Sequence, residues 1–241
     1  MYKKEDLLKG IIELGIEPTD TLLIHSSMKA IGDVDGGADT LLDTFIDYMK
    51  PGLLILPTHT WATINKDGDQ YDPKSTPSCV GILSNLFFKR EGVLRSLHPT
   101  HSVAAIGKNA EDYICLDNSV STPAPWSGCW GELYRRNAKI LFLGCSLNKN
   151  TFIHSVEEWC NIPNRLSKES IKVGIKKTEV LTHKAPVDDI SQNYGRLKEP
   201  MLEKSIVVKA FIGDAESYLC DAKRMADLTR TFLEDNPDYF I

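Results

Sequence analysis

The segment TLLIHSSMKAIGDVDGGADT, residues 21–40, decides how the first part of the chain folds. Leu22, Leu23 and Ile24 make a continuous apolar run, which is typical of a strand covered on both faces. Hydroxyl side chains and glycines follow, and helical apolar spacing begins at residue 39. This order is typical of a phosphate-binding site, because a glycine-bearing turn between a strand and the N-terminus of a helix presents free backbone N–H groups to an anion. An ordinary strand–loop–helix connection explains the same pattern, and the turn matches neither G-x-G-x-x-G nor the Walker A loop.

The rest of the chain alternates buried runs with amphipathic stretches, which predicts an α/β sheet with helices on its faces. Expected strands cover residues 21–25, 53–56, 102–106, 139–144 and 205–212. Expected helices cover residues 4–15, 39–49, 81–90, 109–115, 131–136, 150–159 and 215–233. Residues 162–204 show little periodicity and are expected to form strands and loops beside the main sheet. There is no internal repeat, so residues 1–241 are interpreted as a single domain.

Composition excludes several classes of protein. The formal net charge of −5 argues against general nucleic-acid binding and suits a cationic small molecule. No run approaches the roughly 18–20 apolar residues of a membrane span. The N-terminus mixes acidic with basic residues in an amphipathic helical spacing, which does not resemble a signal peptide. We therefore expect a cytoplasmic protein. Its six scattered cysteines form no C-x-x-C pair, which argues against a structural zinc site and a disulfide framework.

Polar residues follow three of the predicted strands, at residues 25–27, 58–61 and 145–148. Ligands of open α/β sheets bind outside the carboxyl ends of the strands, so these segments predict a cleft. His154 and Glu157 lie three residues apart on the following helix, and therefore on one face. A carboxylate that fixes the tautomer of an imidazole is the usual arrangement of a general base. A simple ion pair on the helix surface explains the same spacing.

The sequence also leaves two other chemistries open, one based on a metal ion and one on a cysteine nucleophile. His98 and His101 in the segment HPTH are candidates for a metal ligand or a second base, or for local hydrogen bonds in a stiff loop. No H-x-H or H-E-x-x-H spacing supports a metal hydrolase. Cys145 precedes His154 by nine residues, so a Cys/His dyad is conceivable, but no G-x-S-x-G elbow is present.

Four blocks match one known family in order. They are HSSMKAIGDVDGGADT (25–40), LILPTHTW (54–61), RSLHPTHSVAAIGKNAEDY (95–113) and KILFLGCSLNKNTFIHSVEEW (139–159). On these blocks the chain resembles the antibiotic N-acetyltransferases, whose best-known members are aminoglycoside 3-N-acetyltransferases. The resemblance implies a three-layer α/β/α sandwich, with a small additional strand and loop lobe from about residue 160 to 204. It also implies transfer of an acetyl group from acetyl-CoA to an amine of an amino sugar, with no metal.

The resemblance also implies roles for individual residues. His154 matches the family's base and Glu157 its partner, so a direct transfer with a histidine general base is expected. Residues expected to contact the coenzyme are His25, Ser26, Ser27, Lys29, Gly32, Val34, Gly36, Ser102 and Val103. Residues expected near a cationic acceptor are Trp61, Asp72, His98, Asn148, Glu158 and Asp189. The only partner expected is this small-molecule amine, bound by a monomer or a homodimer.

The chain departs from the family pattern around the expected acceptor pocket. Gly128-Cys129 replaces the usual Ser-Pro pair, Asn148 stands where many members have Asp, and Ser155 stands where Tyr is frequent. The alternatives are therefore the same chemistry on a biosynthetic amino sugar, from a surface polysaccharide or linked to a nucleotide, or on a small amine metabolite. A second alternative is a non-catalytic protein that binds acyl-CoA.

Overall fold

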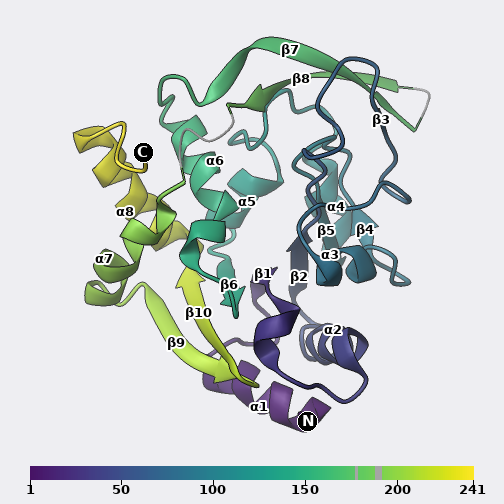
Figure 1. The fold of residues 1–241 in the computed structure, drawn as a ribbon, viewed down its shortest axis with the longest axis vertical. Coiled ribbons are helices and arrows are strands. Elements are labelled where there is room, and N and C mark those ends of the chain that lie inside the picture. Colours follow the sequence, from purple (N-terminus) through teal and green to yellow (C-terminus); the bar gives the residue numbers. More distant parts are fainter. Residues whose placement is uncertain (177–178, 188–191) are drawn as a thin grey trace.

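The computed structural model describes residues 1–176, 179–187 and 192–241, and a seven-stranded sheet runs through its centre (Figure 1). The strand order is β4-β5-β2-β1-β6-β10-β9. The central strands β1 (Thr21–Ser26), β2 (Leu53–Pro57) and β6 (Lys139–Leu143) are parallel. Antiparallel strands flank them: β4 (Leu94–Arg95) and β5 (Val103–Gly107) on one side, β9 (Val207–Ile212) and β10 (Ala215–Asp221) on the other.

Alternating residues of the central strands enter two separate cores. Leu22 and Ile24 pack in one core and Leu23 in the other, as the two-residue period of a strand requires. The first core is covered by α1 (Lys4–Glu13), α2 (Gly37–Tyr48) and α3 (Ile82–Phe87). The second is covered by α4 (Ala110–Cys115), α5 (Cys129–Arg135), α6 (Thr151–Trp159), α7 (Lys198–Glu203) and α8 (Ala222–Asp235). The predicted three-layer α/β/α architecture is confirmed.

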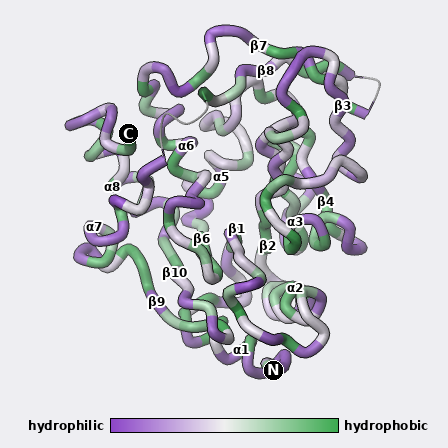
Figure 2. Tube along the Cα trace, viewed as in Figure 1, coloured by the Kyte–Doolittle hydropathy of each residue, from purple (hydrophilic) through white to green (hydrophobic). Residues whose placement is uncertain are grey.

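A second, three-stranded sheet lies at one end of the molecule, across the top of Figure 1. It joins β3 (Gln70–Tyr71) to the hairpin of β7 (Leu166–Ile175) and β8 (Glu179–Pro186). Its small core contains Tyr71, Val173 and Ile175, whereas the first half of β7 is hydrophilic (Figure 2). The expected lobe of strands is therefore present, but the segment also contains two helical turns, η3 (Tyr194–Leu197) and α7.

The prediction of one helix over residues 215–233 is wrong at its start. Residues 215–221 form β10, which pairs with β6 on one side and β9 on the other. The helix begins only at Ala222, where the side chain of Asp221 accepts a hydrogen bond from the backbone amide of Arg224. Within the described residues, no helix is long and apolar enough to cross a membrane.

Candidate functional site

Helix α6 brings His154 and Glu157 together, as their spacing predicts. The helix buries Phe152, Ile153 and Val156 in the core, whereas the side chain of His154 keeps 37% of its surface exposed. The Nδ1 atom of His154 lies 3.4 Å from Oε2 of Glu157, whose side chain is fully buried. The arrangement therefore presents an imidazole to solvent with a buried carboxylate behind it.

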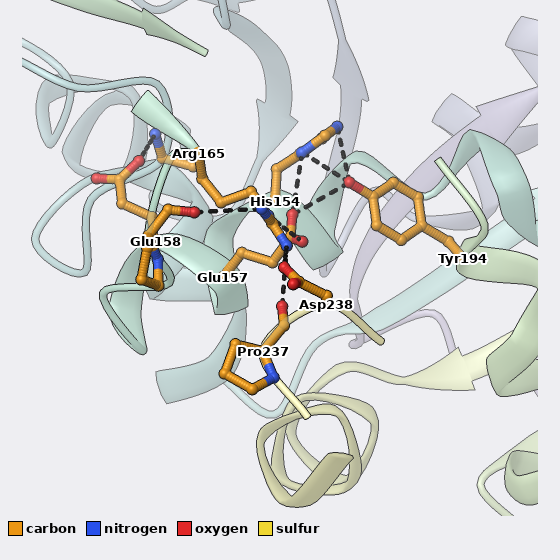
Figure 3. Close-up of polar contacts among 9 residues, drawn as sticks. His154, Glu157, Glu158, Arg165, Tyr194, Pro237 and Asp238 are labelled. Carbon is orange, nitrogen blue, oxygen red and sulfur yellow. Dashed lines mark hydrogen bonds and ion pairs between the residues drawn. The ribbon is translucent and has the colours of Figure 1, made fainter. Parts of the chain in front are cut away.

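Arg165 holds the other oxygen of this carboxylate (Figure 3). Its Nε atom lies 3.0 Å from Oε1 of Glu157. The guanidinium also donates to the backbone oxygen of Pro237 at 2.9 Å and lies 3.5 Å from the carboxylate of Asp238. Because Arg165 is itself almost fully buried, it neutralises a charge that water does not reach.

Tyr194, at the start of η3, supplies a third group to the pair. Its hydroxyl lies 2.7 Å from Nδ1 of His154 and 3.2 Å from Oε2 of Glu157. Neither Tyr194 nor Arg165 is among the predicted site residues, because neither stands in a motif. Tyr194 reaches His154 across 40 residues of sequence. Arg165 lies eight residues after Glu157, outside the three- and four-residue spacings of a helix face.

Glu158 and His98, both expected near the acceptor, form hydrogen bonds with the loop at residues 122–124. Glu158 accepts hydrogen bonds from the hydroxyl of Thr122 and from the amide of Ala124, the latter at 3.0 Å. Burial raises the pKa of Glu158. The Nε2 atom of His98 lies 2.9 Å from the backbone oxygen of Thr122. The structure therefore gives both side chains partners within the chain.

Five histidines besides His154 are buried. The ring of His59 lies 4.9 Å from that of His101, and His98 lies 5.7 Å from His101 and 5.8 Å from His183. His25, expected at the coenzyme, stacks on Phe142 at 5.1 Å. Burial lowers the pKa of these histidines, that of His25 to about 3, so they are neutral at pH 7. Among the described residues, no three His, Cys, Asp or Glu side chains are arranged to hold a metal ion.

The turn after β1 lies beside a pocket of about 450 Å³. Gly32 (φ 84°) and Gly36 (φ 75°) give the turn its left-handed backbone, and the side chain of Lys29 is exposed. Val34 pairs with Tyr2 in an isolated bridge, and Ser26 ends β1. The pocket is lined by Ala30 from this turn, residues 144–148, Gly195, Lys198, residues 214–216 and Tyr218.

Cys145 lines this pocket, but burial raises the pKa of its thiol to about 12. A neutral thiol is a poor nucleophile, so the burial of Cys145 disfavours the Cys/His dyad.

The remaining predicted contacts are dispersed. Ser102 directly precedes β5 and Val103 begins it, and both residues are fully buried. Strand β2 lies between β5 and β1, so these two residues are separated from the turn after β1. The Ser102 hydroxyl donates to the backbone oxygen of Thr58 at 2.8 Å. Asn148 Oδ1 accepts from the amide of Gly195 at 2.5 Å. The backbone amide of Ser27 donates to the backbone oxygen of Leu143, and the side chain of Trp61 is 47% exposed. The pKa of Asp72 is lowered mainly by a hydrogen bond from the backbone amide of Lys74. Asp189 lies outside the described residues.

Known proteins share both the sequence and the fold. The family model described as aminoglycoside 3-N-acetyltransferase matches residues 23–234. Aminoglycoside N(3)-acetyltransferase III from Salmonella sp is 28% identical over 188 residues, which cover 68% of this chain and 63% of that protein. The chain therefore spans less than two thirds of the length of this curated relative.

Two solved structures share the fold at low sequence identity. A mutant of aminoglycoside acetyltransferase AAC(3)-IVa in complex with a gentamicin superposes with a TM-score of 0.87 at 21% identity, over 100% of this chain and 91% of that one. AAC-IIIb in a binary complex with CoASH gives 0.85 at 21% identity, over 97% of each chain. Since the family model covers most of the chain, the chain belongs to the aminoglycoside 3-N-acetyltransferase family.

Proposed function

We propose that this protein transfers an acetyl group from acetyl-CoA directly to an amine of an aminoglycoside or a related amino sugar. The observation that carries the proposal is the pair on α6, in which the half-exposed imidazole of His154 is backed by the buried carboxylate of Glu157. Membership of the family supports the reaction. The similar structures with CoASH and with a gentamicin support the two substrates.

His154 acts as the general base. An amine is mostly protonated at neutral pH, and the ammonium form has no lone pair with which to attack a thioester. The exposed side of the imidazole first takes a proton from the ammonium group, which frees the lone pair of the nitrogen. Glu157 stabilises the resulting imidazolium. As the C–N bond forms and the C–S bond breaks, a second proton passes from that nitrogen to the leaving thiolate, and the imidazolium then releases its proton to solvent. Base assistance of this kind contributes on the order of 10²–10⁴ in rate.

The turn at residues 26–36 suits the phosphates of the coenzyme. It leads into the N-terminus of α2, where Gly36 provides no side-chain cap and leaves backbone N–H groups for an anion. The pocket beside Ala30 is large enough for part of an extended pantetheine chain. Acetyl-CoA supplies the activated acetyl group, and the residues of this turn bind and orient it.

The test is the variant His154→Ala, assayed by release of free thiol from acetyl-CoA with gentamicin as acceptor. The expected result is a fall in kcat on the order of 10²–10⁴, with CoA binding by calorimetry unchanged. Intact CoA binding serves as the control for folding. A loss of less than tenfold would remove His154 as the base, and CoA binding without turnover on any amine would favour the non-catalytic alternative.

The identity of the acceptor needs its own test, because residue 148 is Asn in this chain. It stands where many family members have Asp, and its Oδ1 atom bonds the Gly195 amide at 2.5 Å. A neutral residue in this position attracts a polycation less strongly than a carboxylate. Parallel assays with several aminoglycosides and nucleotide-linked amino sugars decide the acceptor. Higher kcat/KM on the sugar nucleotides would assign the enzyme to biosynthesis.

A further inference from the structure

We infer that Tyr194 is a positioning residue that sets the tautomer of His154, and this inference rests on the proposed role of His154 as the base. Its hydroxyl contacts both the imidazole of His154 and the carboxylate of Glu157 (Figure 3). These contacts form a hydrogen-bonded chain from Glu157 through Tyr194 to His154.

The donor and acceptor capacities of the three groups define the direction of this chain. The Tyr194 hydroxyl donates to Oε2 of Glu157 at 3.2 Å, because an ionised carboxylate only accepts. The hydroxyl oxygen then keeps lone pairs for Nδ1 of His154 at 2.7 Å. The direct contact between Nδ1 and Oε2 is longer, at 3.4 Å. The tyrosine therefore makes the shorter link between the base and its carboxylate.

This arrangement places the imidazole proton on Nδ1. Both acceptors near the ring, the Tyr194 oxygen and Oε2 of Glu157, lie closest to that nitrogen. The hydroxyl is 3.2 Å from Nε2, which is the weaker of its two contacts with the ring. With the proton on Nδ1, the lone pair of Nε2 is the one that accepts a proton from the amine.

The chain holds Tyr194 firmly in this position. The residue is 3% exposed, and its ring packs edge-on against Phe240 at 5.2 Å and against His154 at 5.0 Å. The amide of the next residue, Gly195, donates to Asn148 in the 3-10 turn at residues 147–149, just before α6. The tyrosine is thus anchored beside the helix that carries the base, so its hydroxyl does not need to be ordered when substrate binds.

The test compares Tyr194→Phe with the matched control Tyr134→Phe. The first substitution keeps the ring that packs on Phe240 and removes only the hydroxyl. The Tyr134 hydroxyl bonds Asp227 at 2.8 Å on the exposed side of the molecule, so its loss is expected to leave turnover unchanged. For Tyr194→Phe we expect kcat to fall by roughly ten- to a hundredfold with KM within about twofold. The fall is below the ~10⁴ of a fully lost tautomer-fixing carboxylate, because Glu157 remains.

A ¹⁵N NMR spectrum of His154 reads the tautomer without any acetyl transfer. We expect the Nδ1–H form in the native protein, assigned through His154→Gln, and a shift toward the Nε2–H form in Tyr194→Phe. An Nε2–H form in the native protein, or an unchanged tautomer in Tyr194→Phe, would overturn the inference. If the tautomer behaves as expected but His154→Ala keeps its kcat, the proposed function fails and the positioning by Tyr194 stands.

Discussion

At the residue scale, the site depends on a charge that is buried and paired. Glu157 has no exposed surface, and Arg165 is its guanidinium partner at 3.0 Å. The sequence predicted the carboxylate because it lies three residues from His154 on one helix. It did not predict Arg165 or Tyr194, because the positions of both are set by the fold of a segment without helical or strand periodicity. Helical spacing in the sequence therefore predicts the pair of His154 and Glu157, whereas the contacts that Arg165 and Tyr194 make with it are visible only in the tertiary structure.

Removal of the partner charge should destabilise the protein strongly. Arg165→Met leaves a carboxylate in the core without its cation, and we expect a loss of about 3–5 kcal/mol in unfolding free energy by urea titration. Lys9→Met, which breaks an exposed pair at 3.8 Å, is the control and should cost less than about 1 kcal/mol. The double variant Arg165→Met with Glu157→Gln should regain much of the loss. Equal, small effects for both single variants would argue against a buried ion pair.

The buried histidines make stability depend on pH. The pKa of His25 is lowered by burial to about 3, against 6.5 in an unfolded chain. Between these values only the unfolded state binds the proton, so stability falls as pH drops below 6.5. From pH 7 to pH 5 we expect His25 alone to account for about 1–2 kcal/mol. Urea titrations at both pH values measure this, with His25→Gln expected to show a smaller difference; an identical pH dependence in the variant would count against it.

At the level of helices and strands, a continuous apolar run in the sequence predicts a buried strand correctly, whereas a strand that is defined by pairing with distant strands is not predicted. The apolar runs at residues 21–25, 53–56 and 139–144 correspond to β1, β2 and β6 at the centre of the sheet. Residues 215–221 form a strand rather than the predicted helix, because pairing with β6 and β9 fixes their extended conformation. Such pairing is a long-range interaction, and a local window of sequence does not contain it.

The turn after β1 can be tested with two matched glycine substitutions. Gly32→Ala strains a backbone at φ 84° and would drive a methyl group into a carboxylate oxygen of Asp214. Gly15→Ala imposes a similar strain at φ 82°, with no atom within 4 Å. We expect both to lose about 1–2 kcal/mol of stability, but only Gly32→Ala to weaken CoA binding by calorimetry, by tenfold or more. Equal CoA affinity in the two variants would separate the turn from the coenzyme.

At the scale of the whole molecule, the resemblance predicts the three layers, but not where the C-terminal residues pack. These residues lie behind the site, against Arg165 and the segment before Tyr194. Arg165 donates to Pro237 O, and the amides of Gln192 and Asn193 donate to Phe240 O, just before Tyr194. The last residues of the chain thus hold both the arginine behind Glu157 and the tyrosine beside His154. No motif in the sequence indicates this, because the contacts use backbone oxygens.

Deletion of residues 236–241 should therefore impair the site more than the fold. The truncated chain keeps both sheets and α8, and we expect kcat to fall by at least tenfold while far-ultraviolet circular dichroism stays unchanged. Deletion of Ile241 alone, which is 52% exposed, is the control and should leave kcat intact. Full activity in the longer truncation would contradict a role for this segment.

The proposed function requires the imidazole of His154 to face the thioester end of the coenzyme while the turn after β1 binds its phosphates. A crystal structure of the complex with CoA measures both positions. We expect the pyrophosphate on residues 26–36 and the sulfur beside His154, leaving room for an amine nitrogen within about 3 Å of Nε2 or one water away. A sulfur remote from His154, or a turn without phosphate, would rule out this mechanism.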